Sequence, residues 1–155
     1  MSVLLRFYGK KNLIDIIRKL NYNNDTATWA EIKRSIKSMK ILATNIPNLE
    51  NDKKTLYLLT KKTATPISEL HDDEYDIAWP VDGYLHYEDL NSDGEVIERL
   101  KILSGNRIFS TSGAPAIRTF FEIKDIMGDD PFSINFVERT SNKTKRTYYV
   151  CDLAI

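Results

Sequence analysis

The sequence predicts an α+β domain in which two N-terminal helices pack on a mostly antiparallel sheet with two β-hairpins. Three observations lead to this prediction: two amphipathic stretches early in the chain, a change to strand-like patterns after Pro47, and two pairs of strand-like runs joined by turn sequences. Helical patterns followed by strand patterns are typical of this fold class. The length suits a single domain, residues 1–155, with a hydrophobic core of its own.

Both predicted helices fall within the first 40 residues and follow a strand-like run at residues 3–8. Apolar side chains between Leu13 and Leu20 recur at the spacing of one helical face, which predicts the first helix. Thr28 and Glu31 have the spacing of a capping box, so the second helix is expected to begin there. This second helix is the most basic one in the chain and carries Lys33, Arg34, Lys37 and Lys40.

Strand-like patterns dominate after Pro47. Residues 55–60 are expected to form a strand because their side chains suit a pleated surface. Residues 84–88 and 95–103 flank a turn that contains Asp93-Gly94, which predicts the first hairpin. Residues 107–109 would continue this meander.

The last third of the chain contains one ambiguous segment and the second hairpin. Residues 114–127 leave helix and strand open, since Pro115 suits a first helical turn and Phe120 to Ile123 suits a strand. Residues 132–137 and 148–153 predict the second hairpin. Its tip contains four basic residues and no acid: Arg139, Lys143, Lys145 and Arg146.

Composition narrows the class of protein. The single cysteine, Cys151, excludes an intramolecular disulfide framework and a cysteine-based zinc site, and it favours a cytoplasmic location, in a host cell if the gene is viral. No apolar run is long enough to cross a bilayer, so no membrane partner is expected. Phe, Tyr, Met, Ile, Asn and Lys, whose codons are AT-rich, make up 59 of 155 residues, which suggests a low-GC microbial or viral genome.

Three patterns could carry chemistry. Asp89, Asn91, Asp93 and Gly94 have the spacing of an EF-hand loop, but Leu100 stands where the bidentate glutamate should be, so a hairpin turn is favoured and no metal is expected. A nuclease-like set would combine Asp82 with Glu122 and Lys124, which together could hold magnesium and orient water.

The third pattern runs from Arg6 through Ser110-Thr111-Ser112 to Glu138. Its order resembles the Arg, Ser-Thr-Ser, Glu order of the ADP-ribosyltransferase family. The resemblance implies that Arg6 and Ser110 would steady a nicotinamide dinucleotide and that Glu138 would support an oxocarbenium ion. The family's second acidic or amide residue, two positions before the glutamate, is replaced by Phe136.

Charge is segregated along the chain although the formal net charge is zero. Residues 1–40 carry +6, residues 41–103 carry −7, and residues 104–155 carry +1. The basic helix and the basic hairpin tip predict a recognition surface for phosphates, beside which Tyr148 and Tyr149 could stack on bases. An acidic segment could instead cover a basic cleft on a target protein. It comprises Asp72, Asp73, Glu74, Asp76 and Trp79.

These patterns favour a non-enzymatic binding or inhibitor protein without a cofactor. The hypothesis is that a viral or mobile-element genome encodes it and that it acts on host machinery through a protein partner. Two alternatives stay open: an enzyme that acts on nucleic acid or a nucleotide, and a nucleic-acid-binding module. The sequence does not indicate an oligomeric state.

Overall fold

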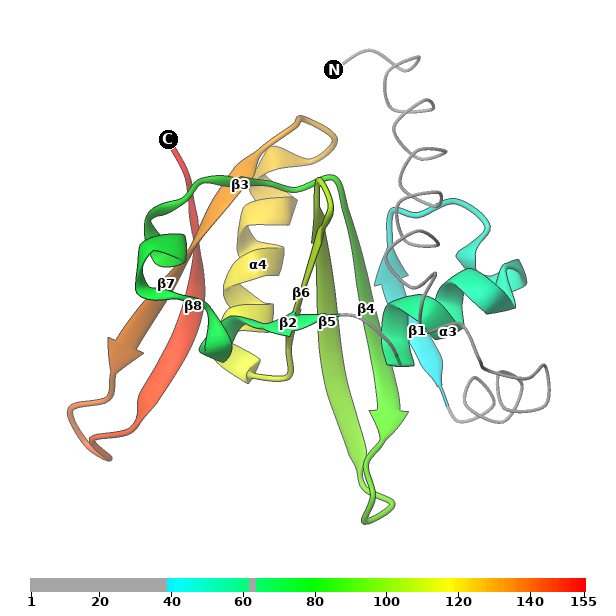
Figure 1. Ribbon diagram of the computed structural model, residues 1–155, viewed down its shortest axis with the longest axis horizontal. Coiled ribbons are helices and arrows are strands. Elements are labelled where there is room, and N and C mark those ends of the chain that lie inside the picture. The colour runs from blue at the N-terminus through cyan, green and yellow to red at the C-terminus, as the bar shows by residue number, and fades with distance from the viewer. Residues whose placement is uncertain (1–38, 62–63) are drawn as a thin grey trace.

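The computed structural model describes residues 39–61 and 64–155 (Figure 1). Over these residues the chain forms two α-helices, α3 (Lys53–Lys61) and α4 (Ala114–Met127), and three short 3₁₀ turns, η2 (Leu49–Asn51), η3 (Ile67–Glu69) and η4 (Asp72–Asp76). Its strands are β1 (Lys40–Thr44), β2 (Thr65–Pro66), β3 (Trp79–Pro80), β4 (Gly83–Leu90), β5 (Val96–Ser104), β6 (Arg107–Thr111), β7 (Ser133–Thr140) and β8 (Thr147–Leu153).

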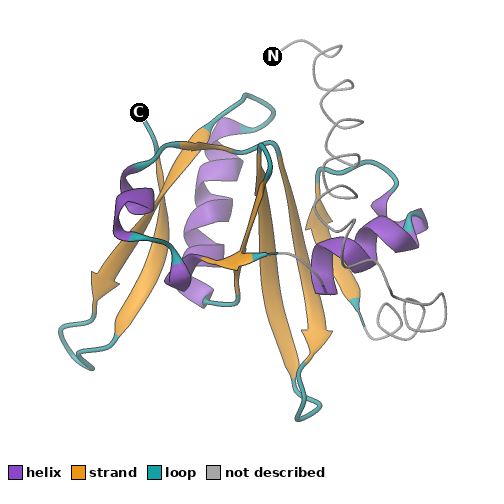
Figure 2. Ribbon diagram, in the orientation of Figure 1, coloured by secondary structure: helices purple, strands orange, loops and turns teal. Residues whose placement is uncertain are grey.

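These strands form two sheets, which are orange in Figure 2. The five-stranded sheet has the order β1-β4-β5-β6-β2, and the three-stranded sheet has the order β3-β7-β8. Every pairing is antiparallel except the short parallel one between β2 and β6. The β4–β5 and β7–β8 hairpins project on the same side of the molecule (Figure 1).

The five-stranded sheet has a hydrophobic core on each face. Because side chains alternate along a strand, Leu85 and Tyr87 of β4 pack with α3, whereas Tyr84 packs with α4. The α4 core also receives side chains from the second sheet, among them the fully buried Phe136. The helix α4 thereby joins the two sheets, as Figure 1 shows.

The ambiguous segment 114–127 is a helix. Its first turn contains Pro115, as the helical alternative required, and Gly128 at φ 59° ends it with a hydrogen bond from its N–H to the Lys124 carbonyl (2.8 Å). Burial of Ile117 and Phe120 favours the helix, because one apolar stripe lets this segment pack against both sheets.

The predicted fold class is wrong. The described helices lie at Lys53–Lys61 and Ala114–Met127, so they are not both N-terminal, and the strands form two sheets instead of one. The predicted strand at residues 3–8, the predicted helix from Leu13 to Leu20 and most of the predicted second helix lie outside the described residues. Lys40, expected at the end of that second helix, begins strand β1 and pairs with Glu88 of β4.

The strand predicted at residues 55–60 is also wrong, since these residues lie in α3. The carboxylate of Asp52 accepts hydrogen bonds from the Thr55 N–H (3.1 Å) and hydroxyl (2.8 Å), which is how an N-terminal cap satisfies the first turn of a helix. Leu56 and Leu59 then pack on the sheet. Side-chain propensity alone favours a strand at these residues, whereas the local cap at Asp52 favours a helix.

Both predicted hairpins are confirmed. Strands β4 and β5 pair from Gly83 and Leu103 to Leu90 and Val96, and β6 continues the meander as expected. Strands β7 and β8 pair from Ile134 and Leu153 outward. The sequence reads these elements well because their turns and their strand alternation are both local features.

Candidate functional site

A cleft of about 440 Å³ lies where the β2–β6 end of the five-stranded sheet meets the starts of α4 and β8. This volume falls within the range of roughly 300–1,000 Å³ that is common for small-molecule sites. It is lined by Pro66, Ile67, Ser68, Arg99, Lys101, Ser110, Thr111, Ser112, Gly113, Pro115, Thr147, Tyr148 and Tyr149.

The lining of the cleft favours anions. Arg99 and Lys101 are two residues apart on β5, so their side chains extend from the same face of the sheet. Ser110 lies opposite Lys101 on β6. Arg99 is half-buried and Lys101 is 7% exposed. Among the described residues that line the cleft there is no Asp or Glu, whereas five are Ser or Thr. Two cations and several hydroxyl donors without a carboxylate suit a phosphate or another oxyanion.

The start of α4 adds to this preference. Gly113 caps the helix without a side-chain hydrogen bond to its first turn, and its own N–H donates to the Thr111 hydroxyl (3.1 Å). Both residues line the cleft together with Pro115. The positive end of a 14-residue helix therefore lies at the cleft, where it stabilises negative charge.

Aromatic side chains form the β8 side of the cleft. Tyr149 stacks on Tyr75, with ring centroids 5.9 Å apart and planes 15° apart. The Tyr75 hydroxyl donates to the Ile67 carbonyl (2.6 Å), and burial raises the pKa of Tyr75 to about 12. Tyr148 is half-buried, and within the described part of the chain no other aromatic ring stacks on it. The cleft thus offers planar surfaces beside its cations.

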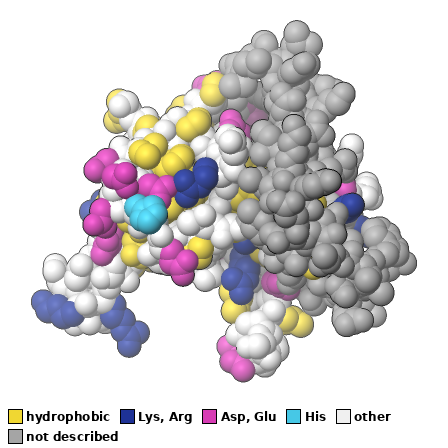
Figure 3. All heavy atoms as spheres, viewed as in Figure 1, with side chains coloured by type: hydrophobic (Ala, Val, Ile, Leu, Met, Phe, Trp, Pro, Cys, Tyr) yellow, Lys and Arg dark blue, Asp and Glu magenta, His cyan; other side chains and the backbone are white. Residues whose placement is uncertain are grey.

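The basic hairpin tip, residues 139–146, continues from this aromatic side. Thr147 lines the cleft and directly follows Arg146. Lys143, Lys145 and Arg146 are exposed, and Figure 3 shows Lys and Arg side chains at this tip, away from the body of the molecule. Arg139 forms an ion pair with Asp152 across the hairpin (3.6 Å). The basic tip expected from the sequence therefore ends one residue before the cleft lining begins.

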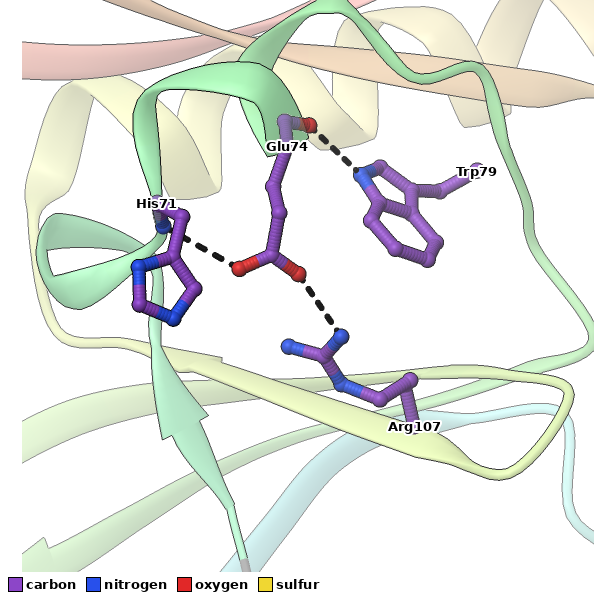
Figure 4. Close-up of polar contacts among 4 residues, drawn as sticks. All are labelled: His71, Glu74, Trp79 and Arg107. Carbon is purple, nitrogen blue, oxygen red and sulfur yellow. Dashed lines mark hydrogen bonds and ion pairs between the residues drawn. The ribbon is translucent and has the colours of Figure 1, made fainter.

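The acidic segment, residues 72–79, is built differently. The Glu74 carboxylate accepts hydrogen bonds from the Arg107 guanidinium (2.7 Å) and from the His71 backbone N–H (3.1 Å), as Figure 4 shows. These contacts hold the pKa of Glu74 below its usual range, with the Arg107 hydrogen bond as the largest cause. The Trp79 indole N–H donates to the Glu74 carbonyl (3.2 Å). We call these four residues the Glu74 network.

Trp79 and Arg107 of this network also pack on the core. The Trp79 ring lies edge-on to Phe109, with centroids 4.8 Å apart, and the Arg107 guanidinium lies 5.0 Å from the centre of the Phe109 ring. Asp72, Asp73 and Asp76 are exposed, and Figure 3 shows acidic side chains gathered over η4. The acidic segment therefore combines an internal network with an outward-facing acidic surface.

Each group of the nuclease-like set has a local partner in the described part of the fold. Glu122 forms an exposed ion pair with Arg118 (3.8 Å), and the Lys124 ammonium donates to the Gly128 carbonyl (2.8 Å). The Asp82 carboxylate accepts from the Gly105 N–H (2.6 Å), which holds the turn between β5 and β6. Each of these groups stabilises local structure.

The EF-hand-like sequence forms the β4–β5 turn. The Asn91 side-chain oxygen accepts from the N–H groups of Asp93 and Glu95 (both 2.9 Å), and Gly94 has φ 80°. The described residues contain no group of three or more His, Cys, Asp or Glu side chains that could hold a metal ion. The segment from Asn91 to Glu95 forms a hairpin turn, which is the structure that the sequence favoured.

Part of the ADP-ribosyltransferase-like pattern reaches the cleft. Ser110, Thr111 and Ser112 line it, while Glu138 is exposed on β7 in register with Tyr149. Arg6 lies outside the described residues, as do Lys33, Arg34 and Lys37 of the predicted basic helix. Lys40 is exposed on β1.

Sequence reasoning missed Arg99 and Lys101. A signal was present, because Arg99 and Lys101 alternate with the apolar residues Leu100 and Ile102 along one strand. It also missed Arg107, whose partner Glu74 is 33 residues away in the chain.

Cys151 is buried, and burial raises the pKa of its thiol to about 12, so the thiol stays protonated at neutral pH.

Comparison of the chain with protein-family models, with curated proteins and with solved structures gives no match. No helix within residues 39–61 and 64–155 is long and apolar enough to cross a membrane. The chemistry of the cleft and of the surfaces beside it is therefore the guide to function.

Proposed function

We propose that the protein acts by binding, without catalysis, and that the cleft recognises a phosphate-bearing ligand. One observation carries the proposal: Arg99, Lys101 and the start of α4 meet at a cleft whose described lining contains hydroxyl groups and no carboxylate. Guanidinium groups, hydroxyls and helix N-termini are the usual partners of phosphate oxygens in proteins. The tyrosines beside them suit a nucleotide base.

Binding is favoured over catalysis by where the acidic groups lie. General acid–base catalysis needs a carboxylate or another titratable group within hydrogen-bond reach of the reacting atoms. Glu122 and Asp82 are engaged elsewhere in the described fold, and neither lines the cleft. Glu138 is the acid that best supports the enzyme alternative, because its register partner Tyr149 lines the cleft.

The test is titration calorimetry with ATP and with inorganic phosphate. Replacing Arg99 with Ala should weaken ATP binding about tenfold or more, because a charge-assisted hydrogen bond to phosphate is lost. Arg99→Lys should retain part of the affinity, and Arg118→Ala, an exposed arginine outside the cleft lining, should leave it unchanged. Equal affinity of the Arg99→Ala variant and the wild-type protein would contradict the proposal.

The same samples separate binding from turnover. Chromatography of ATP and of nicotinamide adenine dinucleotide after incubation should recover both unaltered. Release of nicotinamide by the wild-type protein and its loss in Glu138→Gln would instead support the enzyme alternative.

A second candidate is an inhibitor of a basic protein, for which the acidic surface of η4 is the supporting observation. Asp72, Asp73 and Asp76 are all exposed on this turn. Clustered carboxylates can imitate the phosphates that a basic cleft normally binds. If this is correct, a purified partner should bind with an affinity that falls with salt and on Asp72→Lys together with Asp73→Lys. Affinity unchanged by both substitutions would rule out this surface.

A further inference from the structure

We infer that the ligand of the cleft is a single-stranded nucleic acid, whose backbone runs from the cleft onto the basic hairpin tip. This inference rests on the proposed phosphate site and extends it to a polymer. It is carried by the continuity of two positive surfaces: Thr147 lines the cleft, and the adjacent residue Arg146 begins the tip. Adjacent residues of an extended chain are about 3.3 Å apart along its axis. The first cation of the tip therefore lies next to the cleft lining.

The tip has the form of a cationic arm. Lys143, Lys145 and Arg146 are exposed, and the tip sequence contains no acid. It is held in a fixed shape by backbone hydrogen bonds from the Ser141 N–H to the Arg146 carbonyl and from the Lys145 N–H to the Ser141 carbonyl, both of 2.9 Å. A phosphate backbone that leaves the cleft along β8 would meet these cations in succession.

The backbone at Lys145 points to a role for its charge. Lys145 has φ 59°, in the left-handed region that glycine adopts without cost, and Gly94 has the same sign of φ at the tip of the other hairpin. A lysine there is less stable than a glycine would be. A cation at a position that favours glycine is expected where the cation itself serves a function.

The aromatic side of the cleft favours single strands over duplexes. Tyr148 and Tyr149 line it, and a base can stack on a tyrosine ring only when it is not stacked inside a duplex. A β-ribbon that entered the groove of a duplex would find the bases stacked on one another and would leave these tyrosine rings without a base. The combination of phosphate donors with planar rings therefore indicates unpaired nucleotides.

The experiment compares a fluorescently labelled single-stranded oligonucleotide with ATP, using anisotropy for the oligonucleotide and calorimetry for ATP. The tip variant is Lys143→Glu with Lys145→Glu. The matched control is Lys53→Glu with Lys54→Glu, which makes the same change in net charge at two exposed lysines outside the cleft lining. Thermal unfolding of both variants checks that they are folded.

The tip variant should bind the oligonucleotide at least tenfold more weakly while its affinity for ATP changes less than twofold. Its plot of log affinity against log salt should be shallower by roughly 1.4, because about 0.7 is lost for each phosphate contact with a single strand. The control should keep the wild-type affinity apart from a small general effect of charge. Tyr148→Leu should weaken oligonucleotide binding several-fold, and a duplex should compete less well than a single strand.

The failures of the two proposals are distinguishable. ATP binding that depends on Arg99, together with oligonucleotide binding no tighter than ATP binding, would overturn this inference and leave the phosphate site in place. Equal losses in the tip variant and its control, or equal competition by duplex and single strand, would overturn it as well. Absence of binding to both ligands would overturn both proposals.

Discussion

The acidic segment and the basic hairpin tip look alike in the sequence, as two short runs of like charge with aromatic residues nearby, but they are used differently in the fold. In the acidic segment, Glu74 is paired with Arg107, and its side chain is 13% exposed. Trp79 donates to the Glu74 carbonyl and packs on Phe109. In the basic tip, Lys143 and Lys145 are exposed, and one of them occupies a strained backbone position.

A run of like charges in a sequence therefore does not reveal whether its members hold the fold together or face a ligand. Partners decide this, and Arg107 and Phe109 come from a strand about 30 residues away from η4. Substitutions in the acidic segment should therefore change stability, and those in the tip should change binding. Four predictions test this contrast, in order of their expected effect on stability.

The largest effect is expected for Trp79→Ala. It removes a half-buried ring that contacts Phe109 and Arg107, and it should lower the free energy of unfolding by about 3 kcal/mol. Chemical denaturation measures this loss. Trp79→Phe, which retains a ring but lacks the N–H donated to Glu74, should lose less. A loss below about 0.5 kcal/mol in Trp79→Ala would show that the ring does not stabilise the fold.

Glu74→Gln should lower the melting temperature in a pH-dependent way. The pKa of Glu74 is lowered in the folded protein from an ordinary value of 4.5, so its carboxylate stabilises the fold above that value, and this contribution is lost as pH falls through the lowered pKa. The wild-type protein should therefore melt at a higher temperature than Glu74→Gln at neutral pH, and the gap should close in acid. Asp73→Asn, at an exposed acid of the same turn, is the control. A gap that is constant with pH would contradict the assignment.

Lys145→Gly should stabilise the protein by about 1 kcal/mol. Glycine relieves the left-handed strain at φ 59°, although part of the gain is offset by its greater freedom in the unfolded chain. The same variant should bind a single-stranded oligonucleotide more weakly, as the proposed role of the tip requires. Thermal unfolding and anisotropy on one preparation measure both effects. A variant that is no more stable, or that binds equally well, would remove the strain argument for a functional lysine.

The smallest effect on stability is expected for Lys143→Glu. Its side chain is exposed at the tip, and changes at such positions usually shift the free energy of unfolding by less than about 0.5 kcal/mol. Oligonucleotide affinity should nevertheless fall. A large loss of stability would show that the basic tip, like the Glu74 network, supports the fold.

Local sequence patterns were enough to predict the two hairpins and the turn at Gly94, because these features depend on residues that are close together in the chain. They also marked the basic tip and the segment Ser110–Ser112. The three-dimensional packing was needed to show that residues 114–127 are helical and that Ser110 lies opposite Lys101 at a cleft beside Tyr149. The physical reason is that burial and cross-strand pairing join residues far apart in the chain, and local propensity carries no information about those partners.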